Sequence, residues 1–278
     1  MSTEAFDVLA YSADAHGSHR AELTGLGEPL PAALRQELRY LRRCLSGTTS
    51  WLGLVLVTPT HKNARITAFL SSWAYERHWM ADAIDALTGE VPAPAAPHRG
   101  IRGVRDRFAP LGEALVANLH GTALTGVHMA ERAVDGVFVD ALLAHAIQQG
   151  SAPVAADLGR LRRVLTRQQA FFTEAAGELV AGSGRARRLT RRRLTGRAWP
   201  IGAEDDREGT AAAFASLVSA DAGWARAADE RIGAVPGLAG LDIARRSAGN
   251  PGSPVLRTTL RPVAALGRLA ASVIRRKG

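Results

Sequence analysis

The chain has 278 residues, 46% of them hydrophobic and 5% aromatic, and a formal net charge of +9. This length allows one large domain or one domain with an appendage, and the hydrophobic fraction excludes a disordered chain. The only cysteine is Cys44, which excludes an intrachain disulfide and is typical of a reducing cytoplasm, where we expect the protein.

The positive charge is concentrated in two segments. Residues 184–197 contain seven arginines and no acid, residues 243–278 contain seven arginines, Lys277 and no acid, and the rest of the chain is mildly acidic. Such clusters are typical of contact with an anionic partner or an anionic membrane surface, and a solvated surface is the alternative. The candidate contact residues are Arg187, Arg188, Arg191, Arg192, Arg193, Arg275 and Arg276.

The sequence predicts neither a signal peptide nor a membrane-spanning segment. The opening MSTEAFDVLA has early acids and no basic region, unlike a signal peptide, and the apolar run at 51–57 is too short to cross a bilayer. Apolar residues in 262–276 can share one helix face, so we expect a basic amphipathic helix that docks on the protein or lies on a membrane. Because residues 184–202 lack interleaved aromatics, sequence-specific nucleic-acid binding is not expected.

The predicted elements are helices. Residues 1–30 form a mixed segment with a short helix near 4–15, and helical spacing then predicts long helices over 31–58, 63–87, 110–150 and 153–180. A basic linker is expected at 184–204, followed by a helical extension over 205–278 with helices near 208–232 and 262–276. The predicted segments of the chain therefore end at residues 30, 183 and 204.

No strand pattern of comparable length competes with these helices, so the fold class is all-α. Short links join the first helix to the second and the third to the fourth, and a longer Pro-rich link at 89–108 joins the second to the third. Residues 31–183 are therefore expected to form a four-helix bundle with one longer crossover.

Each of the four long helices carries one polar residue inside its apolar stripe. These residues are Thr48, Glu76, Glu131 and Gln168. A buried carboxylate without partners is costly. We therefore expect the four side chains to meet as a buried polar layer in the bundle core.

In helix order, helix length and the positions of these four polar residues, the segment 31–181 resembles the ferritin-like superfamily. Bundles of that superfamily place Glu on two helices and Glu-x-x-His on two others to hold two metal ions. The resemblance implies iron oxidation or oxygen-activating chemistry. The chain departs from that ligand pattern, because Trp79 and Phe171 stand where the histidines would be, Gln168 replaces a glutamate and Thr48 replaces a carboxylate. A standard di-iron centre is therefore not expected.

Two alternative metal sites remain. Glu76, His128, Glu131 and Asp135 can hold a single iron or manganese ion, because the last three share one helix face. His128 and Asp135 can equally be a surface pair or a core histidine with its acceptor. Near the N-terminus, Asp14, His16 and His19 have a spacing that can bind metal, and a solvated segment is the alternative.

Aromatic residues on the second and fourth helices can be core packing or the walls of an apolar pocket. They are Trp73, Tyr75, Trp79, Phe171 and Phe172.

Two functions follow from these patterns. One is a binding or accessory protein whose former metal cavity has become a polar pocket or a hydrogen-bond network. The other is a metal-dependent oxidoreductase with an altered site. The sequence also leaves a homodimer open.

Overall fold

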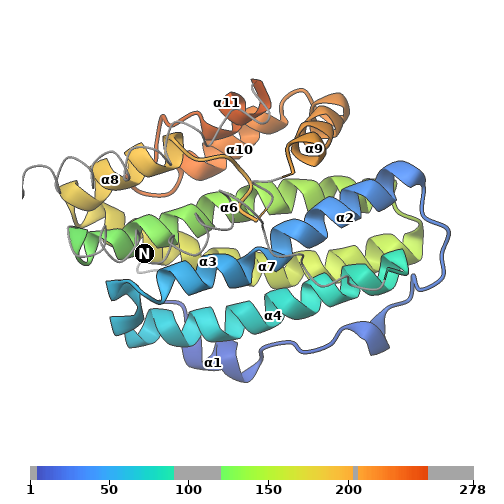
Figure 1. The fold of residues 1–278 in the computed structure, drawn as a ribbon, viewed down its shortest axis with the longest axis horizontal. Coiled ribbons are helices and arrows are strands. Elements are labelled where there is room, and N and C mark those ends of the chain that lie inside the picture. Colours follow the sequence, from blue (N-terminus) through green and yellow to red (C-terminus); the bar gives the residue numbers. More distant parts are fainter. Residues whose placement is uncertain (1–4, 91–119, 203–205, 250–278) are drawn as a thin grey trace, which may run out of the picture.

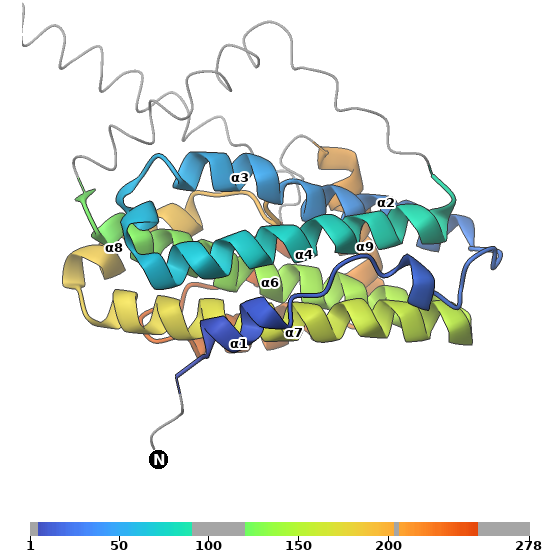
Figure 2. The same ribbon diagram turned by 90° about the horizontal axis from the view of Figure 1, so that it is seen from below.

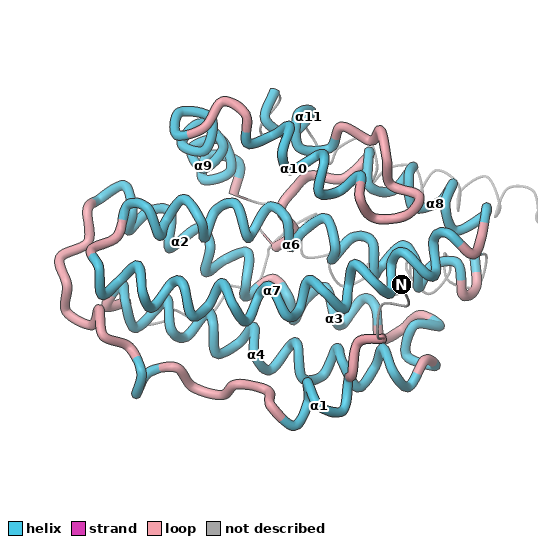
Figure 3. The backbone as a smooth tube through the Cα atoms, turned by 180° about the vertical axis from the view of Figure 1, so that it is seen from behind, coloured by secondary structure: helices cyan, strands magenta, loops and turns pink. Residues whose placement is uncertain are grey.

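The computed structural model describes residues 5–90, 120–202 and 206–249. Within these ranges every regular element is a helix and there is no strand, which confirms the all-α class (Figures 1 and 3). None of the described helices combines the length and the apolar character needed to cross a membrane. The predicted helix at 262–276, with Arg275 and Arg276, lies outside the described residues.

The long helices run side by side along the length of the molecule (Figures 1 and 2). They are α2 (Ala32–Ser46) with α3 (Thr48–Val55), α4 (Ala64–Thr88), α6 (Ala123–Gln149) and α7 (Ala152–Ala181). The start of α4 is capped by the Asn63 side chain, which accepts from the Ile66 amide, and its end is set by Gly89 at φ +70°. These bounds follow the helical spacing of the sequence. The predicted start of the third helix, at residues 110–119, lies outside the described residues.

The first predicted helix is divided at Gly47. A Cβ atom at Gly47 would lie 2.2 Å from the Cα of Gly202, a residue that itself has φ +94°. The segment that follows the arginine-rich stretch therefore passes directly against the junction of α2 and α3, and only glycine allows that approach.

Alanine substitutions at Gly47 and at Gly53 are predicted to have different effects on stability. Gly47→Ala should destabilise the protein by at least about 1–3 kcal/mol, because the new methyl group meets backbone that cannot move aside. Gly53→Ala should be neutral or stabilise by up to about 1 kcal/mol, because Gly53 lies in α3 with nothing within 4 Å of an added Cβ. Urea unfolding of both variants beside the wild type measures the difference. Equal stabilities for the two variants would contradict the close approach.

Helix α6 is the centre of the molecule. Every residue from Leu124 to Asp140 is buried. One side of α6 packs on α7 and α2, and another is covered by α8 (Gly184–Thr195), α9 (Arg207–Ala220) and α10 (Trp224–Gly233) (Figure 1). With α11 (Ile243–Gly249), which packs on α10 and α9, these helices form a C-terminal layer that completes the burial of α6.

Two sequence predictions in the C-terminal layer are corrected. The basic linker at 184–204 contains the helix α8, whose Ala186, Thr190 and Leu194 form a narrow buried stripe at four-residue spacing. The single helix at 208–232 is two helices, because the Asp221 side chain accepts from the Gly223 amide at 2.7 Å and forms a turn between α9 and α10.

The N-terminal segment, residues 5–30, lies on the side of the bundle opposite the C-terminal layer (Figure 1). It contains the short helix α1 (Val8–Ala13) and the 3₁₀ turn η1 (Arg20–Glu22), and α1 packs on α4. A second 3₁₀ turn, η2 (Pro59–Lys62), connects α3 to α4. The carboxylate of Asp157 on α7 accepts from the amides of Thr24 and Gly25, so the segment is fixed to the bundle near its far end as well.

Candidate functional site

The carboxylate of Glu76 is completely buried and accepts four hydrogen bonds. Its Oε2 accepts from the Tyr11 hydroxyl at 2.5 Å and from Gln168 Nε2 at 2.9 Å. Its Oε1 accepts from the His16 amide at 3.1 Å and from Arg167 Nη2 at 3.0 Å. These donors match the roughly four lone-pair sites of a carboxylate. We call these five residues the Glu76 cluster.

The Glu76 cluster joins the N-terminal segment to the bundle. Burial and the nearby carboxylate of Glu76 raise the pKa of Tyr11 above its ordinary value, so its hydroxyl stays protonated and donates. Because Tyr11 and His16 both come from the N-terminal segment, Glu76 holds that segment against α4 and α7.

The carboxylate of Glu131 is also buried, but it has a different set of partners. Its Oε1 accepts from Arg193 Nε at 3.2 Å and from Arg197 Nη1 at 3.0 Å, and its Oε2 accepts from Trp51 Nε1 at 3.3 Å. Burial alone would raise the pKa of Glu131, but Arg197, Arg193 and His128 lower it to about 2. We call Trp51, Glu131, Arg193 and Arg197 the Glu131 cluster.

A third buried acid, Asp135, extends the contact between α6 and the C-terminal layer. It accepts from Arg132 Nη1 at 3.0 Å and from the Ile201 amide at 2.7 Å. The Arg132 guanidinium lies over the rings of Trp51 and Trp73, at 4.1 and 5.1 Å from their centroids. Burial, acting with neighbouring cations, lowers the pKa of Arg132 to about 10, so it stays charged at neutral pH.

The four residues of the predicted polar layer are all buried, but they do not form one layer. Glu76 and Gln168 are hydrogen-bonded to each other, whereas Glu131 shares none of its described hydrogen-bond partners with them. Thr48 Oγ1 and Gln168 Oε1 have no hydrogen-bond partner among the described residues. Glu76 with Gln168, and Glu131 with its own donors, thus belong to two separate hydrogen-bonded clusters.

The predicted single-ion site is not assembled in the described part of the chain. Glu76 and Glu131 accept from different donors, Asp135 is bound by Arg132, and His128 Nδ1 lies 3.0 Å from Thr60 Oγ1. A different group of side chains has its donor atoms gathered within 4.8 Å, and it contains none of the four predicted ligands.

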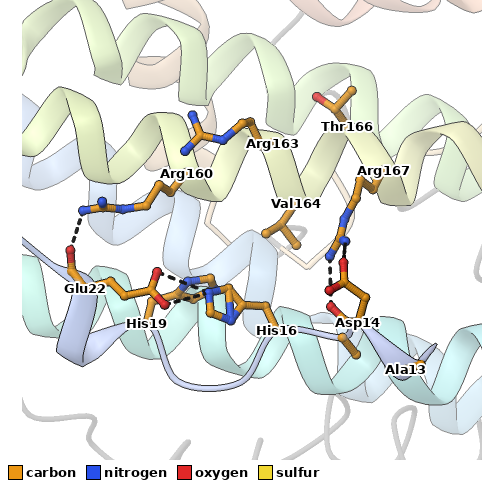
Figure 4. Close-up of a pocket in the computed structure, with 11 residues that line it drawn as sticks. Ala13, Asp14, His16, His19, Glu22, Arg160, Arg163, Val164, Thr166 and Arg167 are labelled. Carbon is orange, nitrogen blue, oxygen red and sulfur yellow. Dashed lines mark hydrogen bonds and ion pairs between the residues drawn. The ribbon is translucent and has the colours of Figure 1, made fainter. Parts of the chain in front are cut away.

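That group is His16, His19 and Glu22, and it lies in a pocket between the N-terminal segment and α7 (Figure 4). The pocket has a volume of about 800 Å³. The polar residues that line it are Asp14, His16, His19, Glu22, Arg160, Arg163, Thr166 and Arg167. Sequence reasoning identified Asp14, His16 and His19 but missed Glu22, although its three-residue step from His19 repeats the step between the histidines.

The predicted aromatic walls do not line this pocket. Trp73, Phe171 and Phe172 are fully buried and pack against one another, with the Trp73 and Phe172 rings 5.3 Å apart. Tyr75 is 49% exposed, and its ring lies 6.1 Å from that of Trp79. The buried three are core packing, and the other two lie near the surface of α4.

The arginines predicted to contact an anionic partner have different environments in α8. Arg193 is bound to Glu131, Arg191 Nη1 donates to backbone carbonyls before α11, and Arg187 Nη2 donates to the last residue of α7. Arg188 and Arg192 are exposed. The exposed positive surface of α8 is therefore smaller than its sequence indicates.

Comparison of the chain with protein-family models, with curated proteins and with solved structures finds no match.

Proposed function

We propose that the chain is a ferritin-like helical-bundle protein of the binding or accessory type. In this proposal, the glutamates at two metal-ligand positions of the family have become acceptors that hold flanking segments on the bundle. The observation that carries it is that Glu76 and Glu131 each have protein donors on both carboxylate oxygens.

The charges around the two glutamates support this function over an oxidoreductase. A divalent ion bound by Glu76 would have to displace Arg167, and one bound by Glu131 would have to displace Arg193 and Arg197. Each displacement would break the arginine's bond to the glutamate and bring the guanidinium close to a second cation, which is unfavourable in a low-dielectric interior.

The pocket between the N-terminal segment and α7 supports a binding role at another place. Two histidines, three arginines and the carboxylates of Asp14 and Glu22 line it, and these polar side chains converge on open space (Figure 4). We assign this pocket as the binding site, where imidazole, carboxylate and guanidinium groups lie together.

Metal analysis of the purified full chain tests this function. After loading with Fe²⁺ or Mn²⁺, the metal content of Glu131→Gln should equal that of the wild type, because Glu131 is bound by protein donors and is not a ligand. Stoichiometric iron or manganese that is lost in this variant would contradict the proposal. That result would support an oxidoreductase built on Glu76, His128, Glu131 and Asp135.

A further inference from the structure

We propose that His16, His19 and Glu22 bind one divalent transition-metal ion, for which zinc is the best fit. The site lies in the pocket that the proposed function assigns as the binding site, and it rests on the proposed function in that respect alone. The donor atoms of all three side chains lie within 4.8 Å of one another, and His16 Nε2 is 3.2 Å from Glu22 Oε1.

The local backbone explains why these side chains converge. His19 is the N-cap of the 3₁₀ turn η1, and Glu22 is the last residue of that turn. Because a 3₁₀ helix has three residues per turn, side chains three positions apart lie one above the other. The His16 ring approaches the His19 ring edge-on, with their centroids 4.2 Å apart.

His19 gives an independent indication of a ligand. Its side chain is buried, with 2% exposed, and neither of its ring nitrogens has a hydrogen-bond partner among the described residues. Buried polar atoms in proteins nearly always have partners.

The segment that carries the three ligands is fixed at several points. The His16 amide donates to the buried carboxylate of Glu76, and Arg20 forms a two-point contact with Asp82 on α4, both bonds being 2.8 Å. On the other side, Arg160 of α7 donates to the backbone carbonyl of Glu22. A ligand set held in this way needs little rearrangement to bind an ion.

The ligand chemistry favours zinc. Tetrahedral zinc with bonds of about 2.0–2.1 Å places its ligand atoms about 3.3 Å apart, close to the observed approach of His16 and Glu22. Two imidazoles and one carboxylate leave a fourth position for water or an anionic group. Arg163, which lines the same pocket, could neutralise such an anion.

The test is titration of the metal-free full chain with Zn²⁺ by calorimetry and with Co²⁺ by absorption spectroscopy. The wild type should bind one equivalent of each ion, and the Co²⁺ complex should show visible bands of a low-coordinate site. His16→Ala and Glu22→Gln should weaken Zn²⁺ binding at least about 10- to 100-fold, the loss seen even for the outer partners of metal ligands. Both side chains are partly exposed, so these variants should fold.

His78→Ala is the matched control, because His78 is an exposed histidine on α4 outside the ligand group, and it should bind Zn²⁺ like the wild type. A wild type that binds no equivalent of Zn²⁺, or a Glu22→Gln variant that binds as tightly as the wild type, would overturn the proposal. Neither result would affect the core glutamates, whereas metal lost in Glu131→Gln would contradict the proposed function alone.

Discussion

Glu131→Ala should lower the free energy of unfolding by about 3–5 kcal/mol, the range measured when one member of a buried ion pair is removed. The substitution leaves the guanidinium groups of Arg193 and Arg197 without their shared acceptor and leaves Trp51 Nε1 unpaired. Urea unfolding of the full chain measures the change. Glu178→Ala on the exposed face of α7 is the control and should remain within about 0.5 kcal/mol of the wild type.

Substitution of Glu131 should also change how the stability of the protein depends on acid pH. The pKa of Glu131 is lowered from 4.5 to about 2 in the folded protein, so its carboxylate contributes stability that is fully present above pH 4.5. That contribution is lost as the pH falls from 4.5 towards 2. Glu131→Gln, which cannot titrate, should lose less stability than the wild type over this window. Parallel acid profiles for the two proteins would contradict the assigned ion pairs.

Glu76→Ala should also destabilise by about 3–5 kcal/mol, because it removes the acceptor of four donors in one buried place. Its distinctive effect should be on the N-terminal segment, where Tyr11 and the His16 amide lose their contact with the bundle. Limited proteolysis should cleave residues 5–30 faster in this variant than in the wild type.

An exposed glutamate on α10 provides the control for this second prediction. Glu230→Ala removes a carboxylate with no described side-chain hydrogen bond and should leave both stability and proteolysis unchanged. If Glu76→Ala were as stable as the wild type, with the N-terminal segment equally protected, Glu76 would have no role in holding that segment.

The helices of the bundle could be predicted because their sequences carry strong helical periodicity and clear end signals. The Asn63 cap and Gly89 set the ends of α4 within a residue or two of the prediction. The burial of Glu76, Glu131 and Gln168 could also be predicted, since each stands inside an apolar stripe.

The C-terminal layer could not be predicted as well, because its signals are weak or tertiary. The buried stripe of α8 consists of one alanine, one threonine and one leucine among arginines, so composition concealed it. Gly202, far along the chain, lies directly against Gly47, and no local pattern indicates that approach.

The residues of the candidate site could likewise be predicted only in part. The short spacing of His16 and His19 was visible in the sequence, whereas the arginines of α7 that line the pocket come from residues 160–167. The donors that reach Glu76 and Glu131 from flanking segments were missed for a similar reason, because Tyr11, Arg193 and Arg197 lie outside the four helices that carry the polar pattern. Helical spacing identifies a buried carboxylate but cannot identify which distant donor reaches it.

The central claim is that Glu76 and Glu131 hold two different flanking segments, and native-state hydrogen exchange of Glu76→Gln and Glu131→Gln tests it most directly. Glu76→Gln should increase exchange in residues 5–30, including the His16 amide, and leave α8 unchanged. Glu131→Gln should increase exchange in α8 and the following residues up to Ile201, and leave residues 5–30 unchanged. If both variants loosened the same segments, the two glutamates would belong to one shared site, and the claim of two separate attachments would be contradicted.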